Sequence, residues 1–268
     1  MGTLQGELLP KRGRKLLPDD QVSAATRKLR MLRNLACGNK YEKLARSQGA
    51  VTVAGVDEVG RGALFGPVVA AAVILPPDTR IRGLRDSKQL LPEDRERLEV
   101  VVRSRAIAFA VEEVDAETID RVNIYQASRM AMSAAVLRLA VQPDHLLIDA
   151  LRLDLPHAQT AIIYGDSLSI SIAAASVVAK VYRDRRMCEF DVEYPGYGLA
   201  SHKGYATPEH REALKNLGPC PLHRKSFAPV LQADLPWDEF ADDSIPEAEI
   251  LDEAIPEEAR LCPTDSSA

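Results

Sequence analysis

One segment, residues 51 to 77, constrains the fold of this 268-residue chain more than any other, and it reads VTVAGVDEVGRGALFGPVVAAAVILPP. Its first run is short and rich in β-branched residues, as in a buried strand, and it ends on Asp57 and Glu58. The stretch Gly60-Arg61-Gly62 follows, and glycines let a ligand approach the main chain closely. Residues 68 to 75 predict a second strand. Two adjacent carboxylates at a strand end, followed by a glycine loop, suit a metal-assisted site that acts on a phosphate.

Two further apolar runs also lead to an aspartate. Residues 145 to 148 end on Asp149, and residues 160 to 164 are followed by Gly165 and Asp166. A single aspartate at a strand end is more often a turn or a helix cap. If all three strands share one sheet, however, four acids gather at one edge and repel one another unless Mg²⁺ or Mn²⁺ neutralises them. A set of oxygen ligands without cysteine or histidine suits these hard cations and disfavours zinc.

The glycine stretch has two other interpretations. Gly60, Gly62 and Gly66 resemble a dinucleotide-binding fingerprint, but the spacing is one residue too long and a β-rich run follows where a helix is needed. The adjacent acids would also repel a pyrophosphate. A plain tight turn is the simpler alternative, although a turn does not need an arginine between two glycines.

The remaining elements follow from apolar periodicity, helix-start signals and caps. We expect helices over residues 92–104, from Asp115, over 123–140, over 172–194 and over 208–217, and a strand over 107–114. The predicted organisation is a disordered basic arm (1–22), a helical extension (23–50), a catalytic domain (51–231) and a disordered acidic tail (232–268).

The net charge of −5 is unevenly distributed along the chain. Residues 1–50 carry 11 Lys and Arg against 4 Asp and Glu, whereas residues 232–268 carry 1 against 12. The 181 residues between them are nearly balanced, with 22 against 23. A basic arm and a balanced core that hides several acids in a site are compatible with a polyanionic substrate.

The sequence also bears on where the protein works. Its four cysteines are scattered, with no C-x-x-C pair, so we expect free thiols and a reducing compartment. No run of about 18 apolar residues could span a bilayer, and the first residues lack the apolar region of a signal peptide. These features predict a cytoplasmic protein without a membrane partner.

A series of motifs resembles bacterial ribonuclease HII, the type 2 ribonuclease H family. In chain order they are GVDEVGRG (55–62), GPVVAAAVIL (66–75), DSKxL (86–90), LLID (146–149), GDSLSISIAAASVVAKVYRDR (165–185), YPGYG (194–198), SHKGYAT (201–207) and HRKSFAPV (223–230). The resemblance implies an α/β protein with a ribonuclease H-like fold. That fold is a mixed five-stranded sheet flanked by helices and followed by a small C-terminal helical region.

The same resemblance implies an activity. Asp57, Glu58, Asp149 and Asp166 match the four metal-binding acids of the family, which hold two Mg²⁺ or Mn²⁺ ions at the scissile phosphate. The expected reaction is hydrolysis of the RNA strand of RNA/DNA hybrids, and cutting 5′ of single ribonucleotides embedded in duplex DNA. Its products carry 5′-phosphate and 3′-hydroxyl ends.

Other matched residues imply how substrate is chosen. Gly60, Arg61 and Gly62 match the loop that reads the ribose 2′-hydroxyl, and Tyr205 matches the tyrosine that senses the following deoxyribose. Candidates for contacts to backbone phosphates, which position a substrate without reading its sequence, are Lys88, Lys180, Arg183, Lys203, Arg224 and Lys225. The chain departs from the family at residues 63–65, where Ala-Leu-Phe replaces the usual Pro-Leu-Ala.

Two alternative functions and one partner complete these expectations. A non-catalytic module that binds RNA/DNA hybrids would not need all four acids, and another nuclease or integrase of similar fold would lack the glycine loop and Tyr205. Residues Gln232 to Trp237 resemble a peptide that binds the bacterial sliding clamp. We expect a monomer.

Overall fold

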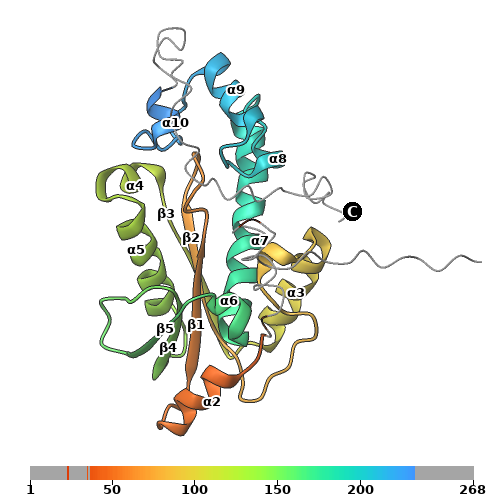
Figure 1. Ribbon diagram of the computed structural model, residues 1–268, viewed down its shortest axis with the longest axis vertical. Coiled ribbons are helices and arrows are strands. Elements are labelled where there is room, and N and C mark those ends of the chain that lie inside the picture. Colours follow the sequence, from red (N-terminus) through yellow and green to blue (C-terminus); the bar gives the residue numbers. More distant parts are fainter. Residues whose placement is uncertain (1–22, 24–34, 36, 233–268) are drawn as a thin grey trace, which may run out of the picture. The chain divides into compact units, whose positions relative to one another are not determined.

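The computed structural model describes Ser23, Leu35 and residues 37 to 232. The predicted basic arm and all of the predicted acidic tail except Gln232 lie outside these residues, so the boundaries proposed for them stay predictions. Within the described residues, a five-stranded sheet has the strand order β3-β2-β1-β4-β5 (Figure 1). The strands are β1 (Val53–Val59), β2 (Val68–Ile74), β3 (Ala108–Val114), β4 (His145–Asp149) and β5 (Ala158–Ile162).

The sheet is mixed, as predicted. The strand β1 pairs antiparallel with β2, and β2 pairs antiparallel with β3. On its other side β1 runs parallel to β4, which in turn runs parallel to β5. Because β1 and β2 lie inside the sheet with helices on both faces, β2 is buried along its whole length, and its small Ala70, Ala71 and Ala72 allow close packing.

Helices cover both faces of the sheet (Figure 1). On one face lie α4 (Ala116–Val122) and α5 (Ile124–Leu137), and on the other lie α3 (Pro92–Arg105) and the long α7 (Ile170–Glu193). Alternate residues of the strands enter two separate apolar clusters, one with α5 and one with α7. This alternation decides which side chains of β1 face α7: Gly55 and Asp57 do, whereas Ala54 and Val56 pack in the α5 cluster.

The predicted C-terminal helical region packs on the last turns of α7. It comprises α8 (Leu199–His202), α9 (Pro208–Leu217) and α10 (Ala228–Leu231). Its apolar cluster includes Met187 and Phe190 of α7 together with Leu64 and Phe65 of the loop between β1 and β2. The departure at position 65 therefore fills the centre of this cluster, where the Phe65 ring makes edge contacts with Phe190 and His223.

Of the predicted helical extension, the structure describes mainly α2 (Lys40–Ser47). This helix is fixed to the start of α7 by the buried Glu42. One oxygen of Glu42 accepts hydrogen bonds from the Ser169 hydroxyl at 2.6 Å and from the Ser171 amide at 2.9 Å. A carboxylate at the first turn of a long helix is also favoured by the helix dipole.

Two predicted strand ends are wrong. The first strand does not stop at Asp57 and Glu58, because the ladder with β2 continues through both residues to Val59. The fifth strand ends at Ile162, so Asp166 lies in a short helix, α6 (Gly165–Leu168), rather than at a strand end. Only Asp149 ends a strand as predicted. The apolar pattern could not locate these ends, since pairing with a neighbouring strand sets them.

The expectations about environment have mixed outcomes. No helix in the described part of the chain combines the length and apolar character needed to cross a membrane. Cys37 and Cys220 are free thiols, as expected, whereas Cys188 is disulfide-bonded and contradicts that expectation. Cysteine spacing along the sequence does not show which sulfurs the fold brings within bonding distance.

The packing of β1 against α7 depends on Gly55. A Cβ at this position would overlap the main chain of Ser171 and Ile172 at the start of α7. Gly62 is the matched comparison, because a Cβ there would meet no atom within 4 Å. We expect Gly55→Ala to destabilise the protein by about 3 kcal/mol or more, at the upper end of overpacking costs, and Gly62→Ala to leave stability unchanged. Thermal unfolding of both variants measures this, and equal unfolding midpoints would contradict it.

Candidate active site

Parallel pairing of β1 with β4 brings the first acids together. Val56 lies opposite Ile148, so Asp57 and Asp149 follow at the same level of neighbouring strands. The side chain of Asp57 is hydrogen-bonded by Ser176 of α7. Asp149 is fixed differently, since its Oδ1 accepts a 2.8 Å hydrogen bond from the amide of Gly165, the residue before Asp166. The sheet register and one turn thus assemble three acids from three separate elements.

Burial and mutual repulsion raise the pKa of each of the four acids. For Asp57, desolvation is the main cause, and the charges of Asp149, Glu58 and Asp166 add to it. Desolvation likewise raises the pKa values of Glu58 and Asp149, while Arg61 lowers that of Glu58 and the Gly165 hydrogen bond lowers that of Asp149. The pKa of Asp166 rises to about 7, mainly through desolvation and then through the charges of Asp86 and Asp149. The quartet that the sequence predicted is therefore one electrostatically coupled group.

The donor set fits a hard divalent cation. Glu58 Oε2 is buried without a hydrogen-bond partner, and an oxygen left in that state has a large desolvation cost unless a cation or water reaches it. No three His, Cys, Asp or Glu side chains in the described ranges are arranged to hold an ion as they stand. Several oxygens are instead engaged within the protein, such as Glu58 Oε1 with Arg61 at 3.0 Å. Binding an ion would therefore require these carboxylates to turn.

Asp86 is a fifth acid at the site, and the sequence analysis did not assign it a role. It is buried, and its carboxylate raises the pKa of Asp166. It also accepts hydrogen bonds from the amide of Lys88 at 2.9 Å and from the Gln89 side chain at 3.2 Å. The DSK motif at residues 86–88 was the signal in the sequence that could have identified Asp86. An aspartate at the start of a turn more often caps that turn, so the motif alone did not indicate a place among the acids.

The glycine loop and Tyr205 form one assembly. Ala63 pairs with Tyr205 in a short antiparallel bridge, and the Leu64 amide donates to the carbonyl of Gly204 at 2.8 Å. Gly60 has a φ of +90°, and a Cβ on it would overlap the side chain of Arg183. Backbone pairing therefore fixes the glycine loop to the segment around Tyr205, which lies about 140 residues further along the chain.

Two of the predicted phosphate contacts, Arg183 and Arg224, are fully buried. Arg183 donates to the carbonyls of Phe65, Pro67 and Lys203, at 2.9 to 3.2 Å. Arg224 donates to the carbonyls of Gly66 and Arg61, both at 2.9 Å. Both guanidinium groups thus hold the main chain of the glycine loop, which differs from the exposed phosphate contacts that we expected.

The other four predicted cations divide into buried and exposed groups. Lys203 is buried and donates to the carbonyl of Ala200, and Lys180 forms an ion pair with Asp184 at 2.9 Å. Lys180 and Arg183 also lie over the Tyr205 ring, at 5.8 and 5.5 Å from its centroid. Lys88 and Lys225 are exposed. Lys88 is near enough to lower the pKa values of Glu58, Asp149 and Asp166, so it belongs to the site.

Two buried histidines, His210 and His223, form a hydrogen-bonded chain that ends on the main-chain carbonyl of Tyr205. The Cys220 amide donates to His223 Nδ1, so the proton of His223 lies on Nε2 and points to His210 Nε2 at 3.2 Å. His210 must then carry its proton on Nδ1, which donates to the carbonyl of Tyr205 at 2.9 Å. The hydrogen bonds therefore fix both rings as neutral tautomers.

A third ring, His202, stacks on His210 with centroids 4.4 Å apart. Its Nδ1 accepts from the Gly204 amide, and its Nε2 donates to the carbonyl of Tyr197 at 2.7 Å. Burial lowers the pKa of all three histidines, to about 3 for His210 and about 4 for His223. Protonating any of them would place a new N–H against an existing donor or another ring.

Comparison with known proteins agrees with this architecture. The family model described as Ribonuclease HII matches residues 54–230. The chain is 56% identical over 239 residues to a ribonuclease HII of Koribacter versatilis (strain Ellin345), covering 87% of this chain and 94% of the relative. It is 57% identical over 194 residues to a ribonuclease HII of Solibacter usitatus (strain Ellin6076), covering 72% and 85%.

Solved structures show the same fold. The ribonuclease H2 from Pyrococcus horikoshii OT3 has a TM-score of 0.60 and 25% identity, covering 68% of this chain and 97% of that one. An RNase HII structure from Archaeoglobus fulgidus, in a PCNA complex, has a TM-score of 0.56 and 27% identity, covering 64% and 91%. The mixed sheet and its flanking helices thus define a protein of the ribonuclease H-like fold. More narrowly, the chain belongs to the ribonuclease HII family, and it is an endoribonuclease that hydrolyses the RNA strand of RNA/DNA hybrids.

The buried acids generate a prediction about stability. A carboxyl whose pKa is raised on folding destabilises the folded state at pH values above that raised pKa, and the cost is relieved as the pH falls. We therefore expect Asp57→Asn, which removes one buried charge, to raise the unfolding temperature of the protein in EDTA at pH 8. An exchange of equal shape at an exposed acid, Asp154→Asn, should not do so. A lower midpoint for Asp57→Asn than for Asp154→Asn would contradict the electrostatic argument.

The three histidines predict the opposite pH dependence. Because their pKa values are lowered in the folded state, their contribution to stability is complete above the unfolded value of about 6.5 and is lost as the pH falls from there toward 4. Between pH 7 and pH 5 this loss opposes the gain from protonating the buried acids, which the histidine variants share with the unmodified protein. We therefore expect the chemical unfolding midpoint of the unmodified protein to fall relative to that of His210→Gln over this range, whereas His157→Gln, outside the cluster, should follow the unmodified protein.

Proposed function

We propose that this endoribonuclease also cuts 5′ of single ribonucleotides embedded in duplex DNA, with two Mg²⁺ or Mn²⁺ ions, leaving 5′-phosphate and 3′-hydroxyl ends. The observation that carries the proposal is the adjacency of a coupled acid quartet and a prebuilt loop that holds Tyr205. The quartet alone would suit many nucleases. The loop supplies the means to choose a junction between RNA and DNA.

Asp57, Glu58, Asp149 and Asp166 would hold the ions. When bound, divalent cations supply charge neutralisation at the scissile phosphate and a more acidic water. The protein itself contributes the repulsion between its carboxylates, which raises their pKa values. A bound cation relieves this repulsion, and the free energy that is relieved favours cation binding. Lys88, exposed beside the acids, is placed to attract a phosphate. Arg61 leaves one Glu58 oxygen free while it neutralises the other.

Recognition of the ribose rests on the main chain of residues 60–62. Gly62 needs no unusual backbone angle, and the space that its side chain would fill is open, so a sugar can approach the peptide groups directly. The carbonyl of Arg61 is held by Arg224, which fixes the direction of the loop. Tyr205, tied to Ala63, would then stack on the next sugar. Since the 2′-hydroxyl is the feature that separates RNA from DNA, a rigid loop of this kind favours selectivity.

Two partner assignments also belong to the proposal. Lys88, Lys180 and Lys225 remain candidates for phosphate contacts, while Arg183, Arg224 and Lys203 act through the loop.

Gln232, exposed after α10, begins the segment that resembles a sliding-clamp peptide, and the RNase HII of Archaeoglobus fulgidus is seen in a complex with PCNA. The rest of that segment lies outside the described residues. We also propose that the protein is a monomer and that it is cytoplasmic.

One cleavage assay tests the function. A DNA duplex with a single ribonucleotide is incubated with the enzyme and Mg²⁺, Mn²⁺ or EDTA, beside matched all-DNA, all-RNA and RNA/DNA duplexes. We expect a cut 5′ of the ribonucleotide that requires a cation, no cut in all-DNA, and no cut by Asp149→Asn, which should still bind the hybrid. Gly62→Ala should fold normally and lose activity at the single ribonucleotide. Equal cutting of the all-DNA duplex would refute recognition of the 2′-hydroxyl.

A further inference from the structure

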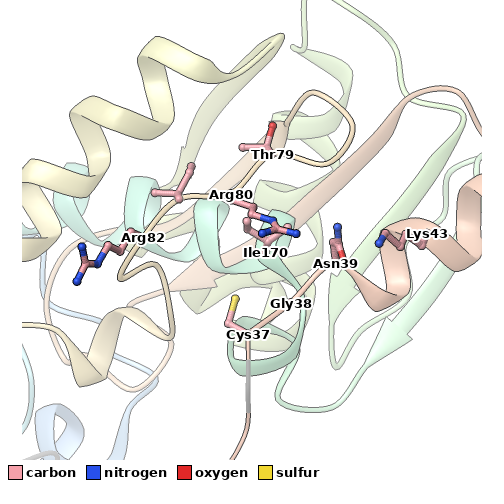
Figure 2. Close-up of a pocket in the computed structure, with 9 residues that line it drawn as sticks. Cys37, Gly38, Asn39, Lys43, Thr79, Arg80, Arg82 and Ile170 are labelled. Atoms are coloured by element: carbon pink, nitrogen blue, oxygen red, sulfur yellow. The ribbon is translucent and has the colours of Figure 1, made fainter.

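A cavity of about 450 Å³ lies beside the start of α7 (Figure 2). It is lined by Cys37, Gly38, Asn39, Lys43, Thr79, Arg80, Ile81, Arg82 and Ile170. Three segments that are distant in sequence therefore form it: the lead into α2, the loop after β2 and the first residue of α7. None of the four catalytic acids is among the lining residues, and the proposed function assigns the cavity no role.

The cavity is cationic. Lys43, Arg80 and Arg82 line it, and within the described ranges neither arginine has a carboxylate partner. Figure 2 shows the Arg80 guanidinium and the Lys43 ammonium extending toward Asn39 from opposite sides, while Arg82 extends away from them. The nearby Asp78 pairs weakly with Lys43, at 3.9 Å, and with the Asn39 amide, at 3.5 Å. An arginine, a lysine and an amide group around one space form a suitable donor set for a phosphate.

The walls of the cavity are held in place by hydrogen bonds. Arg105 of α3 donates to the carbonyl of Arg80 at 2.9 Å, and the Thr79 hydroxyl donates to that of Pro76 at 2.7 Å. Opposite them, the Ile170 amide donates to the carbonyl of Gly38 at 2.8 Å. The cations therefore project from a fixed frame rather than from a free loop.

The helix α7 places this cavity relative to the active site. Ile170 lines the cavity, Ser176 bonds to Asp57, and Arg183 lies over Tyr205. At 1.5 Å per residue, Ser176 is about 9 Å along the helix from Ile170, and Arg183 is about 10 Å further on. The acids thus lie between the cavity and Tyr205. Burial is the main cause that raises the pKa of the Cys37 thiol to about 12, and the charges of Glu42 and Asp166 add to it, so the thiol is neutral toward an anion.

We propose that this cavity binds a backbone phosphate of the nucleic-acid substrate, on the opposite side of the scissile position from Tyr205. The inference rests on the proposed function. If Tyr205 contacts the deoxyribose that follows the ribonucleotide, the phosphate in the cavity belongs to the duplex on the 5′ side. Arg80 and Lys43 make the contact, Asn39 donates to it, and Arg82 adds to the attraction at longer range.

The test measures binding of a duplex with one ribonucleotide to full-length protein carrying Asp149→Asn, by fluorescence anisotropy at several salt concentrations. In this background, Arg80→Ala and Lys43→Ala should each weaken binding several-fold and reduce the slope of log K against log salt by about 0.9, the loss expected for one phosphate contact. Arg138→Ala removes the same charge from the C-terminal end of α5, on the face of the sheet opposite α7, where it pairs with Glu112, and should change neither quantity. Asp78→Asn should act in the opposite direction and tighten binding.

Shortened duplexes locate the contact. Trimming the duplex on the 5′ side of the ribonucleotide should remove the difference between Arg80→Ala and its parent, whereas trimming on the 3′ side should preserve it. If Arg80→Ala and Lys43→Ala bind like Arg138→Ala, or if Asp78→Asn weakens binding, the cavity proposal is wrong. Because the unmodified enzyme's cleavage is assayed separately, that outcome leaves the proposed function standing, and an enzyme that neither binds nor cuts overturns both.

Discussion

The burial of several like charges under α7 is the constraint on which the rest of the site depends. Asp57 and Asp149 lie at the same level of two neighbouring parallel strands, where Asp57 is buried and Asp149 is partly buried. Protein hydrogen bonds compensate this only in part: the Ser176 hydroxyl donates to Asp57, and the Gly165 amide donates to Asp149. Glu58 keeps one buried oxygen without any partner. A site with this electrostatic strain favours a cation, because the cation removes the repulsion that raises the carboxyl pKa values.

The proposed selectivity for a ribose has a different physical basis from the proposed metal-dependent hydrolysis. The loop after β1 has few side chains that could contact a substrate, and its conformation is imposed by two buried arginines that bond only to carbonyls. Burying a guanidinium without a carboxylate is costly, as the lowered pKa of Arg224 reflects, so several carbonyl bonds have to offset that cost. The neutral histidines His210 and His223 add uncharged support to the same region. The result is a rigid peptide surface.

The long α7 unites these functions. Its first turn lines the cationic cavity and packs on Gly55, its Ser176 bonds to Asp57, and its later turns carry Lys180 and Arg183 over the Tyr205 ring. One rigid helix thereby sets the spacing between the acids and the regions on either side of them. In the proposed function, a substrate strand that follows this helix would meet phosphate-binding, acidic and sugar-reading groups in turn.

The sequence by itself determined the class of fold and, through its motifs, predicted the four acids as metal ligands, because apolar runs, glycines and acids are local features that a chain carries wherever it folds. It located the helix from Pro92 within one residue of its end and the helix over Pro208–Leu217 fully. Only the tertiary structure decided where strands end, since Asp57 continues β1 through pairing with β2. It also decided that Arg183 and Arg224 hold carbonyls, that Asp86 joins the acids and that Arg80 meets Lys43 at one cavity. Each of these depends on what surrounds a charged side chain. The identity of a basic or acidic residue in the sequence does not show whether its side chain faces solvent or a buried carbonyl.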